Sequence, residues 1–167
     1  MNYTSAQAAK LLSKLQQDLE RLTIQEENSK TFLASVGEDV ESVRPEYNYD
    51  ETKNQLSDLE IKIRKVKHAI NAFNTTAVIP GFDMTIDEML VYIPQLSKKK
   101  AKLKEMANAL PKARSRGYDR SNIIDYKYIN YDLNTVRTDL DVITEELSTA
   151  QLALDSINHT AMINIDI

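Results

Sequence analysis

The sequence predicts a mainly α-helical protein built from two antiparallel, coiled-coil-like helical hairpins, that is four long helices, with a small β-cap. Apolar residues recur alternately three and four positions apart over long stretches, as on a helix that presents one stripe to a partner helix. Only three glycines and four prolines are present, too few for the many turns of a sandwich or barrel. The length of 167 residues fits a single domain, residues 1–167.

The first predicted helix begins near residue 4 and ends before Gly37. Glu26 and Ser29 occupy positions that the stripe reserves for apolar residues, so they weaken or specify this seam. Leu33 and Val36 return to the apolar rhythm and extend the expected helix. The stripe before the polar interruption consists of Ala8, Leu12, Leu15, Leu19 and Leu22.

The second and fourth predicted helices keep the rhythm almost without a break. Pro80 and Gly81 follow the second helix as stop signals, and Asn74 and Asn158 are read as helix-ending residues. The second stripe consists of Leu56, Leu59, Ile63, Val66, Ile70 and Phe73, and the fourth of Leu133, Val136, Leu140, Ile143, Leu147, Ala150, Leu154 and Ile157.

The third predicted helix opens with a capping box from Thr85 to Glu88, in which hydroxyl and carboxylate satisfy otherwise unpaired backbone donors. Pro94 lies about two turns inside and predicts either a kink or a later helix start. Lys100 interrupts the stripe, and Pro111 follows as the stop signal. The stripe consists of Ile86, Met89, Ile93, Leu96, Leu103 and Leu110.

An internal repeat supports the hairpin interpretation. Shifting the sequence by 84 positions superimposes the stripe of the second helix on the end of the fourth, and it also aligns residues 74–77 with residues 158–161. Because this match crosses a helix end, we predict two hairpin repeats, at about 4–74 and 85–158. A chance match between two heptad-rich segments is the alternative.

Three segments have the alternation of short strands and are expected to form the β-cap. They lie near residues 77–79, 123–129 and 161–167. Tyr126 and Tyr128 belong to the middle segment, where we expect them to cover the end of the helical core, with ligand contact as the alternative.

No pattern of catalytic residues is found, so the sequence predicts no enzyme, no catalytic residues, no cofactor and no metal. Cysteine is absent, and the two histidines lack the Glu-x-x-His spacing of a di-iron bundle. No glycine-rich phosphate loop or nucleophile elbow occurs. Because no apolar window approaches the roughly 20 residues of a membrane span and no signal peptide precedes the first helix, we expect no transmembrane segment and a cytoplasmic location.

Charge is distributed unevenly along the chain. Residues 98–120 contain nine basic and two acidic residues, a net charge of +7, whereas the whole chain carries −4 and the remainder therefore −11. A basic strip near aromatic residues can hold nucleic acid or another anionic surface. The favoured interpretation is that the strip meets acidic surface on the same chain or on a second copy, and the pI near 5.3 also weighs against an obligate nucleic-acid binder. The candidate anion-binding residues are Lys98, Lys99, Lys102, Arg114, Arg116 and Arg120.

The order of several short motifs resembles the septicolysin-like proteins of bacteria, a largely uncharacterised helical family. The resemblance covers most of the chain and implies a helical, hairpin-built fold, while the family label suggests a cytolysin. It assigns no functional residues. The motifs are Tyr47-Asn48-Tyr49-Asp50, Lys67-His68-Ala69-Ile70-Asn71, Thr85-Ile86-Asp87-Glu88, Ser121-Asn122-Ile123-Ile124-Asp125-Tyr126 and Asn158-x-Thr160.

Narrow apolar stripes suggest that some apolar surface is buried between subunits. We therefore expect a non-enzymatic, self-associating structural or assembly module that forms a homo-oligomer. Binding of nucleic acid or an anionic surface through residues 98–120 is the alternative, and a membrane-active, cytolysin-like role is a third.

Overall fold

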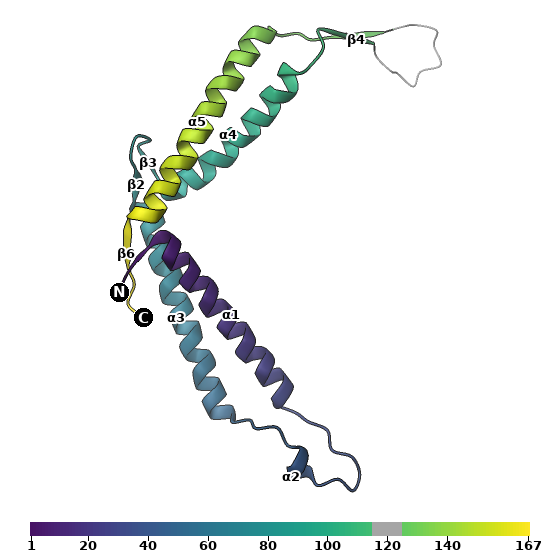
Figure 1. The fold of residues 1–167 in the computed structure, drawn as a ribbon, viewed down its shortest axis with the longest axis vertical. Coiled ribbons are helices and arrows are strands. Elements are labelled where there is room, and N and C mark those ends of the chain that lie inside the picture. The colour runs from purple at the N-terminus through teal and green to yellow at the C-terminus, as the bar shows by residue number, and fades with distance from the viewer. Residues whose placement is uncertain (115–124) are drawn as a thin grey trace. The chain divides into compact units, whose positions relative to one another are not determined.

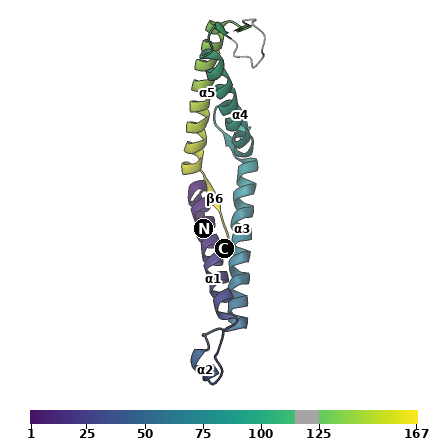
Figure 2. The same ribbon diagram turned by 90° about the vertical axis from the view of Figure 1, so that its right-hand side faces the viewer.

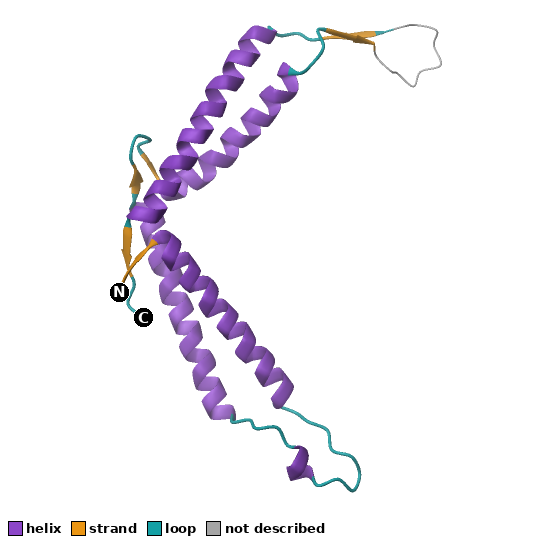
Figure 3. Ribbon diagram, in the orientation of Figure 1, coloured by secondary structure: helices purple, strands orange, loops and turns teal. Residues whose placement is uncertain are grey.

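The computed structural model describes residues 1–114 and 125–167. As predicted, this part of the chain is mainly helical, with small antiparallel sheets (Figure 3). The helices are α1 (Ser5–Ser29), α2 (Val40–Val43), α3 (Tyr49–Thr76), α4 (Ile86–Ala107) and α5 (Leu133–Thr160). The strands are β1 (Asn2–Thr4), β2 (Val78–Ile79), β3 (Met84–Thr85), β4 (Lys112–Arg114), β5 (Tyr126–Tyr128) and β6 (Met162–Asn164).

The chain forms two compact units. Unit 1 comprises Met1–Ala77 together with Ser156–Ile167, and unit 2 comprises Val78–Asp155. Helix α5 begins in unit 2, and its last turn and β6 belong to unit 1. The last residues of the chain are therefore part of the same unit as the first helix.

The core of unit 1 lies between α1 and α3, which run side by side (Figures 1 and 2). Ala8 of α1 and Val66 of α3 are fully buried, and Ile163 and Ile165 from the end of the chain complete the cluster. Partly buried side chains surround these four residues, namely Tyr3, Leu11, Leu12, Leu15, Ala69, Ile70 and Phe73. The apolar stripes that the sequence predicts for α1 and α3 supply most of this cluster.

Strands β1 and β6 hold the two isoleucines in place. The strands pair antiparallel, with Tyr3 opposite Ile163. Beyond this pairing, the backbone N–H of Ile165 donates to the carbonyl of Met1 at 2.9 Å, and the terminal ammonium of Met1 donates to the carbonyl of Ile165 at 2.9 Å. The alternation of buried and exposed residues over 162–166 follows from this extended backbone.

Helix α1 ends earlier than the apolar rhythm indicates, so the expected extension to Val36 is wrong. The helix stops at Ser29, and Leu33 and Val36 are exposed, with 96% and 109% of their reference surface accessible. Glu26 is held by Tyr47, whose hydroxyl donates to its carboxylate at 3.0 Å. With polar groups at the seam, a longer helix would gain no buried apolar surface to offset its conformational entropy.

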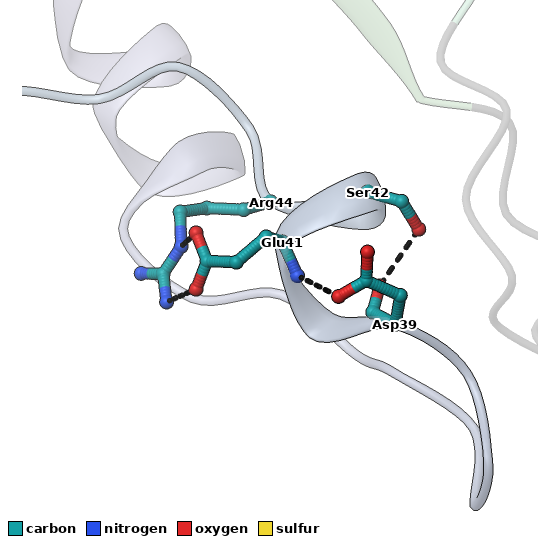
Figure 4. A network of polar contacts seen from close by, with 4 residues as sticks. All are labelled: Asp39, Glu41, Ser42 and Arg44. Carbon is teal, nitrogen blue, oxygen red and sulfur yellow. Dashed lines mark hydrogen bonds and ion pairs between the residues drawn. The ribbon is translucent and has the colours of Figure 1, made fainter.

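The loop after α1 contains the short helix α2 and a local polar network (Figure 4). Asp39 caps α2 by accepting from the backbone N–H of Glu41 at 3.2 Å, and the hydroxyl of Ser42 donates to the carbonyl of Asp39 at 2.7 Å. Arg44 donates two hydrogen bonds to Glu41, at 2.9 and 2.7 Å. These bonds lower the pKa of Glu41 and raise that of Arg44.

In unit 2, the predicted capping box is present at the start of α4. The N–H of Thr85 donates to Glu88 at 2.7 Å, and the N–H of Glu88 donates to the hydroxyl of Thr85 at 3.3 Å. Pro94 lies inside the helix, so a late helix start is excluded. Helix α4 ends at Ala107, and Leu110, assigned to its stripe from the sequence, is 68% exposed beyond it.

Helices α4 and α5 supply most of the buried apolar residues of unit 2. Their backbones lie farther apart than those of α1 and α3. The hydroxyl of Tyr92 on α4 donates to the carboxylate of Glu146 on α5, and this bond raises the pKa of Tyr92. The buried apolar residues are Ile79, Ile86, Met89, Leu96, Val136, Leu147 and Ala150.

The described strands do not form the single β-cap that the sequence predicted. Three separate two-stranded sheets pair β1 with β6, β2 with β3, and β4 with β5. Each segment expected to be extended pairs with a strand that the sequence did not indicate, because the partner segments show no clear alternation of apolar and polar residues. The β2–β3 turn needs positive φ angles at Gly81 (86°) and Asp83 (48°). Residues 123 and 124 of the predicted middle segment lie outside the described residues.

Alanine substitutions at a buried and at an exposed leucine test which residues of the predicted stripes belong to the core. Leu96 is fully buried, whereas Leu33 is 96% exposed. Leu96→Ala should lower the free energy of unfolding by about 2–5 kcal/mol because it leaves a cavity. Leu33→Ala should change it by less than about 0.5 kcal/mol. Urea denaturation of the two variants measures both values, and equal losses would contradict the early end of α1.

Acid should destabilise unit 2 through two helix caps. Backbone N–H groups of Thr85 and Thr135 hydrogen bond to Glu88 and Asp132, and these bonds lower the pKa of each carboxyl below its ordinary value, 4.5 and 3.8 respectively. Their stabilising contribution is therefore present above those values and is lost as the pH falls through the lower pKa of the folded state.

The variant Glu88→Gln tests this pH dependence, because glutamine can keep the capping box, as Gln7 does at the start of α1. It should lose less stability than the wild type between about pH 7 and pH 3 in urea titrations. Glu105→Gln, at an exposed carboxylate of the same helix, is the control and should behave like the wild type. Equal acid sensitivity of Glu88→Gln and the wild type would refute the assignment.

Candidate functional site

The basic residues singled out in the sequence fall on two elements of unit 2. Lys98, Lys99 and Lys102 are exposed on α4, and Lys98 and Lys102 share a face because they are four residues apart. Arg114 is exposed on β4. Arg116 and Arg120 lie outside the described residues.

The described basic residues of this region form no ion pair with a described carboxylate. Ion pairs in unit 1 join Asp18 with Arg21, Glu27 with Lys30, and Glu41 with Arg44. No described carboxylate approaches the lysines of α4 or the cations of β4 within 4.0 Å. Close ion pairing with described carboxylates therefore does not neutralise this part of the basic strip.

Lys99 and Lys102 border a groove between α4 and α5. The groove has a volume of about 410 Å³, and Asp139 is the acidic residue among those that line it. Apolar side chains form the rest of its wall, namely Leu103, Met106, Val136, Val142 and Ile143. One carboxylate opposes two ammonium groups, so the mouth of the groove keeps a positive charge.

Strands β4 and β5 form a ribbon at the end of unit 2 where α4 ends and α5 begins (Figure 1). Lys112 is opposite Tyr128, and Arg114 is opposite Tyr126. Directly opposed residues point to the same side of a sheet, as do residues two apart, so these four side chains share one side of the ribbon. We call this side the basic-aromatic face, and Ala113 and Lys127 lie on the other side.

Lys112 is positioned by the two tyrosine rings. Its ammonium lies 4.1 Å from the ring centroid of Tyr126 and 5.5 Å from that of Tyr128, distances at which the ring quadrupole attracts a cation. Tyr126 and Tyr128 are 47% and 61% exposed. The expectation that they cover the helical core is therefore wrong, because the ribbon carries them beyond the helix ends.

The base of the ribbon is anchored by hydrogen bonds. The N–H of Ile129 donates to the carbonyl of Pro111 at 3.3 Å, which extends the pairing toward the helices. The hydroxyl of Tyr131 donates to the carbonyl of Met106 at 2.9 Å, near the end of α4. A two-stranded ribbon is marginal alone, and these contacts supply support for it.

Sequence reasoning missed Lys112 as a site residue. The alternation Tyr126-Lys127-Tyr128 indicated a strand, but nothing in the three residues Lys112-Ala113-Arg114 indicated its partner. The available signal was the position of both segments between two helix ends, which is where a hairpin can form.

Unit 1 contains a polar groove of about 310 Å³ between α1 and α3. Glu26 and Ser29, the polar interruptions of the first stripe, line it together with Tyr47. Partial burial and the hydrogen bond to Glu26 raise the pKa of Tyr47. The interruption therefore replaces apolar packing with a polar contact at the open end of the helix pair.

Two further classes of site can be judged for residues 1–114 and 125–167. No group of three or more histidine or acidic side chains is placed to hold a metal ion. No helix in the same ranges has the length and apolar character needed to cross a bilayer.

Comparison with known proteins gives the fold alone. No family model and no curated protein matches the chain. The structure is similar to the crystal structure of a functionally unknown conserved protein from Corynebacterium diphtheriae, with a TM-score of 0.59 and 20% sequence identity. The similarity covers 98% of this chain and 100% of that one, so a similar fold extends over the full length of that protein.

Proposed function

We propose that this protein is a non-enzymatic, self-associating structural or assembly module in which α1 with α3 and α4 with α5 act as coiled-coil-like hairpins. One observation carries the proposal. Helix α5 has a second stripe, on its exposed side, that is almost free of charge. This outer stripe of α5 consists of Thr135, Thr138, Val142, Glu145, Thr149 and Leu152, all exposed and spaced three or four apart.

The threonines make this stripe less polar than its sequence suggests. The hydroxyl of Thr138 donates to the carbonyl of Asn134 at 3.0 Å, and that of Thr149 donates to the carbonyl of Glu145 at 2.9 Å. Each hydroxyl is thus satisfied within its own helix. A partner helix can cover the stripe without leaving these groups unpaired.

Exposed apolar side chains on α5 and α4 also support self-association. Val142 and Leu152 are 57% and 67% exposed, and on α4 Leu90 and Val91 are 49% and 58% exposed. Burial of apolar surface contributes about 25 cal/mol per Å² to the free energy of association. A helix of a second copy that packs along the stripe would bury several of these side chains and so stabilise the complex. A second copy is the partner we favour, because most soluble oligomers are homo-oligomers.

The resemblance to septicolysin-like proteins, the internal repeat and the cytoplasmic location stay predictions. Within residues 1–114 and 125–167, no structural feature supports a cytolysin-like role, which rests on the family resemblance alone. We therefore place it below self-association.

Light scattering after size exclusion tests the proposal. The wild type at micromolar concentration should have a mass that is a multiple of 19.0 kDa. Leu152→Lys combined with Val142→Lys should shift it to 19.0 kDa, because two ammonium groups would have to be buried in the interface.

Ser148→Lys is the matched control, since Ser148 is exposed on α5 but outside the outer stripe. It should keep the mass of the wild type. A wild type that is monomeric at micromolar concentration, or a control that dissociates as readily as the double variant, would refute the proposal.

A further inference from the structure

We propose that the basic-aromatic face of the β4–β5 ribbon binds single-stranded nucleic acid. Lys112 and Arg114 would contact phosphates, and the rings of Tyr126 and Tyr128 would stack on bases. The inference rests on the ribbon geometry and is independent of self-association through the outer stripe of α5.

The basic-aromatic face carries two positive charges. Lys112 and Arg114 are exposed, and neither pairs with a described carboxylate. Lys112 lies over the two rings at cation–π distances and forms no ion pair with a described carboxylate, so the rings help to position its ammonium without neutralising it. An approaching phosphate can therefore bind it without first displacing a described carboxylate.

The two tyrosine rings lie next to each other along this face. Tyr126 and Tyr128 are two residues apart on one strand, about 7 Å along it, and both side chains are about half exposed. Aromatic rings that flank cations along a positively charged path are how sequence-tolerant single-strand binders hold successive bases.

The combination of cations and aromatic rings on this face favours one class of ligand over others. A carboxylate of an acidic protein would use the two cations and leave both rings exposed to water. A duplex would offer phosphates, but its bases are stacked on each other and present no free face. Only an unpaired strand uses the cations and both rings together.

Additional positive charge lies on the same unit. Lys98, Lys99 and Lys102 on α4 are exposed and also lack described carboxylate partners. They would add long-range attraction for the phosphate backbone, while the ribbon supplies the contacts to bases.

Fluorescence anisotropy with a short labelled oligothymidine tests the proposal. The wild type should bind at about 50 mM salt and weaken steeply toward about 200 mM, because phosphate binding releases counterions. Tyr126→Leu and Tyr128→Leu should each weaken binding about tenfold, whereas Tyr126→Phe should stay within about twofold because it keeps the ring face.

A matched pair of lysine variants separates the two ribbon faces. Lys112→Ala should weaken binding and reduce the slope of log K against log salt by about 0.7. Lys127→Ala removes the same charge from the opposite side, so it should leave the slope unchanged. Tyr49→Leu, at a 59% exposed tyrosine of unit 1, controls for loss of an exposed ring and should bind like the wild type.

Several results would overturn the proposal. These are no binding at low salt, tighter binding of the matching duplex, or equal effects of Lys112→Ala and Lys127→Ala without any effect of the tyrosine variants. A change in oligomeric mass on Lys112→Ala without any oligonucleotide binding would instead identify the ribbon as a contact for acidic surface of a second copy. Circular dichroism of each variant checks that the helices are intact.

Discussion

The packing of one narrow apolar stripe against another is the constraint on which the rest of the structure depends. A helix pair buries only the residues at the seam, and everything else faces solvent. In unit 1, the seam is built on fully buried Ala8 and Val66, small enough for α1 and α3 to approach closely. Ile163 and Ile165 then pack against this seam from one side. The first helix and the last strand of the chain are thereby joined in one core.

In unit 2, larger side chains are fully buried. Leu96 and Met89 are fully buried, and the helices stand farther apart, linked across the seam by Tyr92 and Glu146. The outer stripe of α5 lies on an exposed helix face, and the basic-aromatic face lies on the connection between α4 and α5. We proposed these two surfaces as the sites of self-association and of nucleic-acid binding.

Sequence periodicity predicted the long helices well because their seams repeat over many turns. It failed where a pattern continued by chance, as at Leu33 and Val36, since the polar interruption at Glu26 was visible in the sequence but its hydrogen bond with Tyr47 and the end of the helix at Ser29 were not. Strand partners could not be predicted, because segments such as Lys112-Ala113-Arg114 show no clear alternation of large apolar and polar residues. Which strands meet is decided by the ends of the helices that they follow or precede.

The candidate site was predicted in composition but not in geometry. The excess of positive charge identified Lys98, Lys99, Lys102 and Arg114, which the structure places on an exposed helix face and a ribbon. The contact between Lys112 and the tyrosine rings joins residues 14 and 16 positions apart, and it depends on a strand register that the sequence alone does not determine.

Amide hydrogen exchange resolved by residue tests the central claim, that each unit is held by a helix seam and that unit 1 is completed by the last strand. The account predicts strong protection along α1 to about Ser29, fast exchange from 31 to 38, and protection of Ile165, whose N–H is bonded to Met1, together with α1 and α3. Protection that continues through Val36, or free exchange at Ile163 and Ile165 while α1 and α3 stay protected, would contradict it.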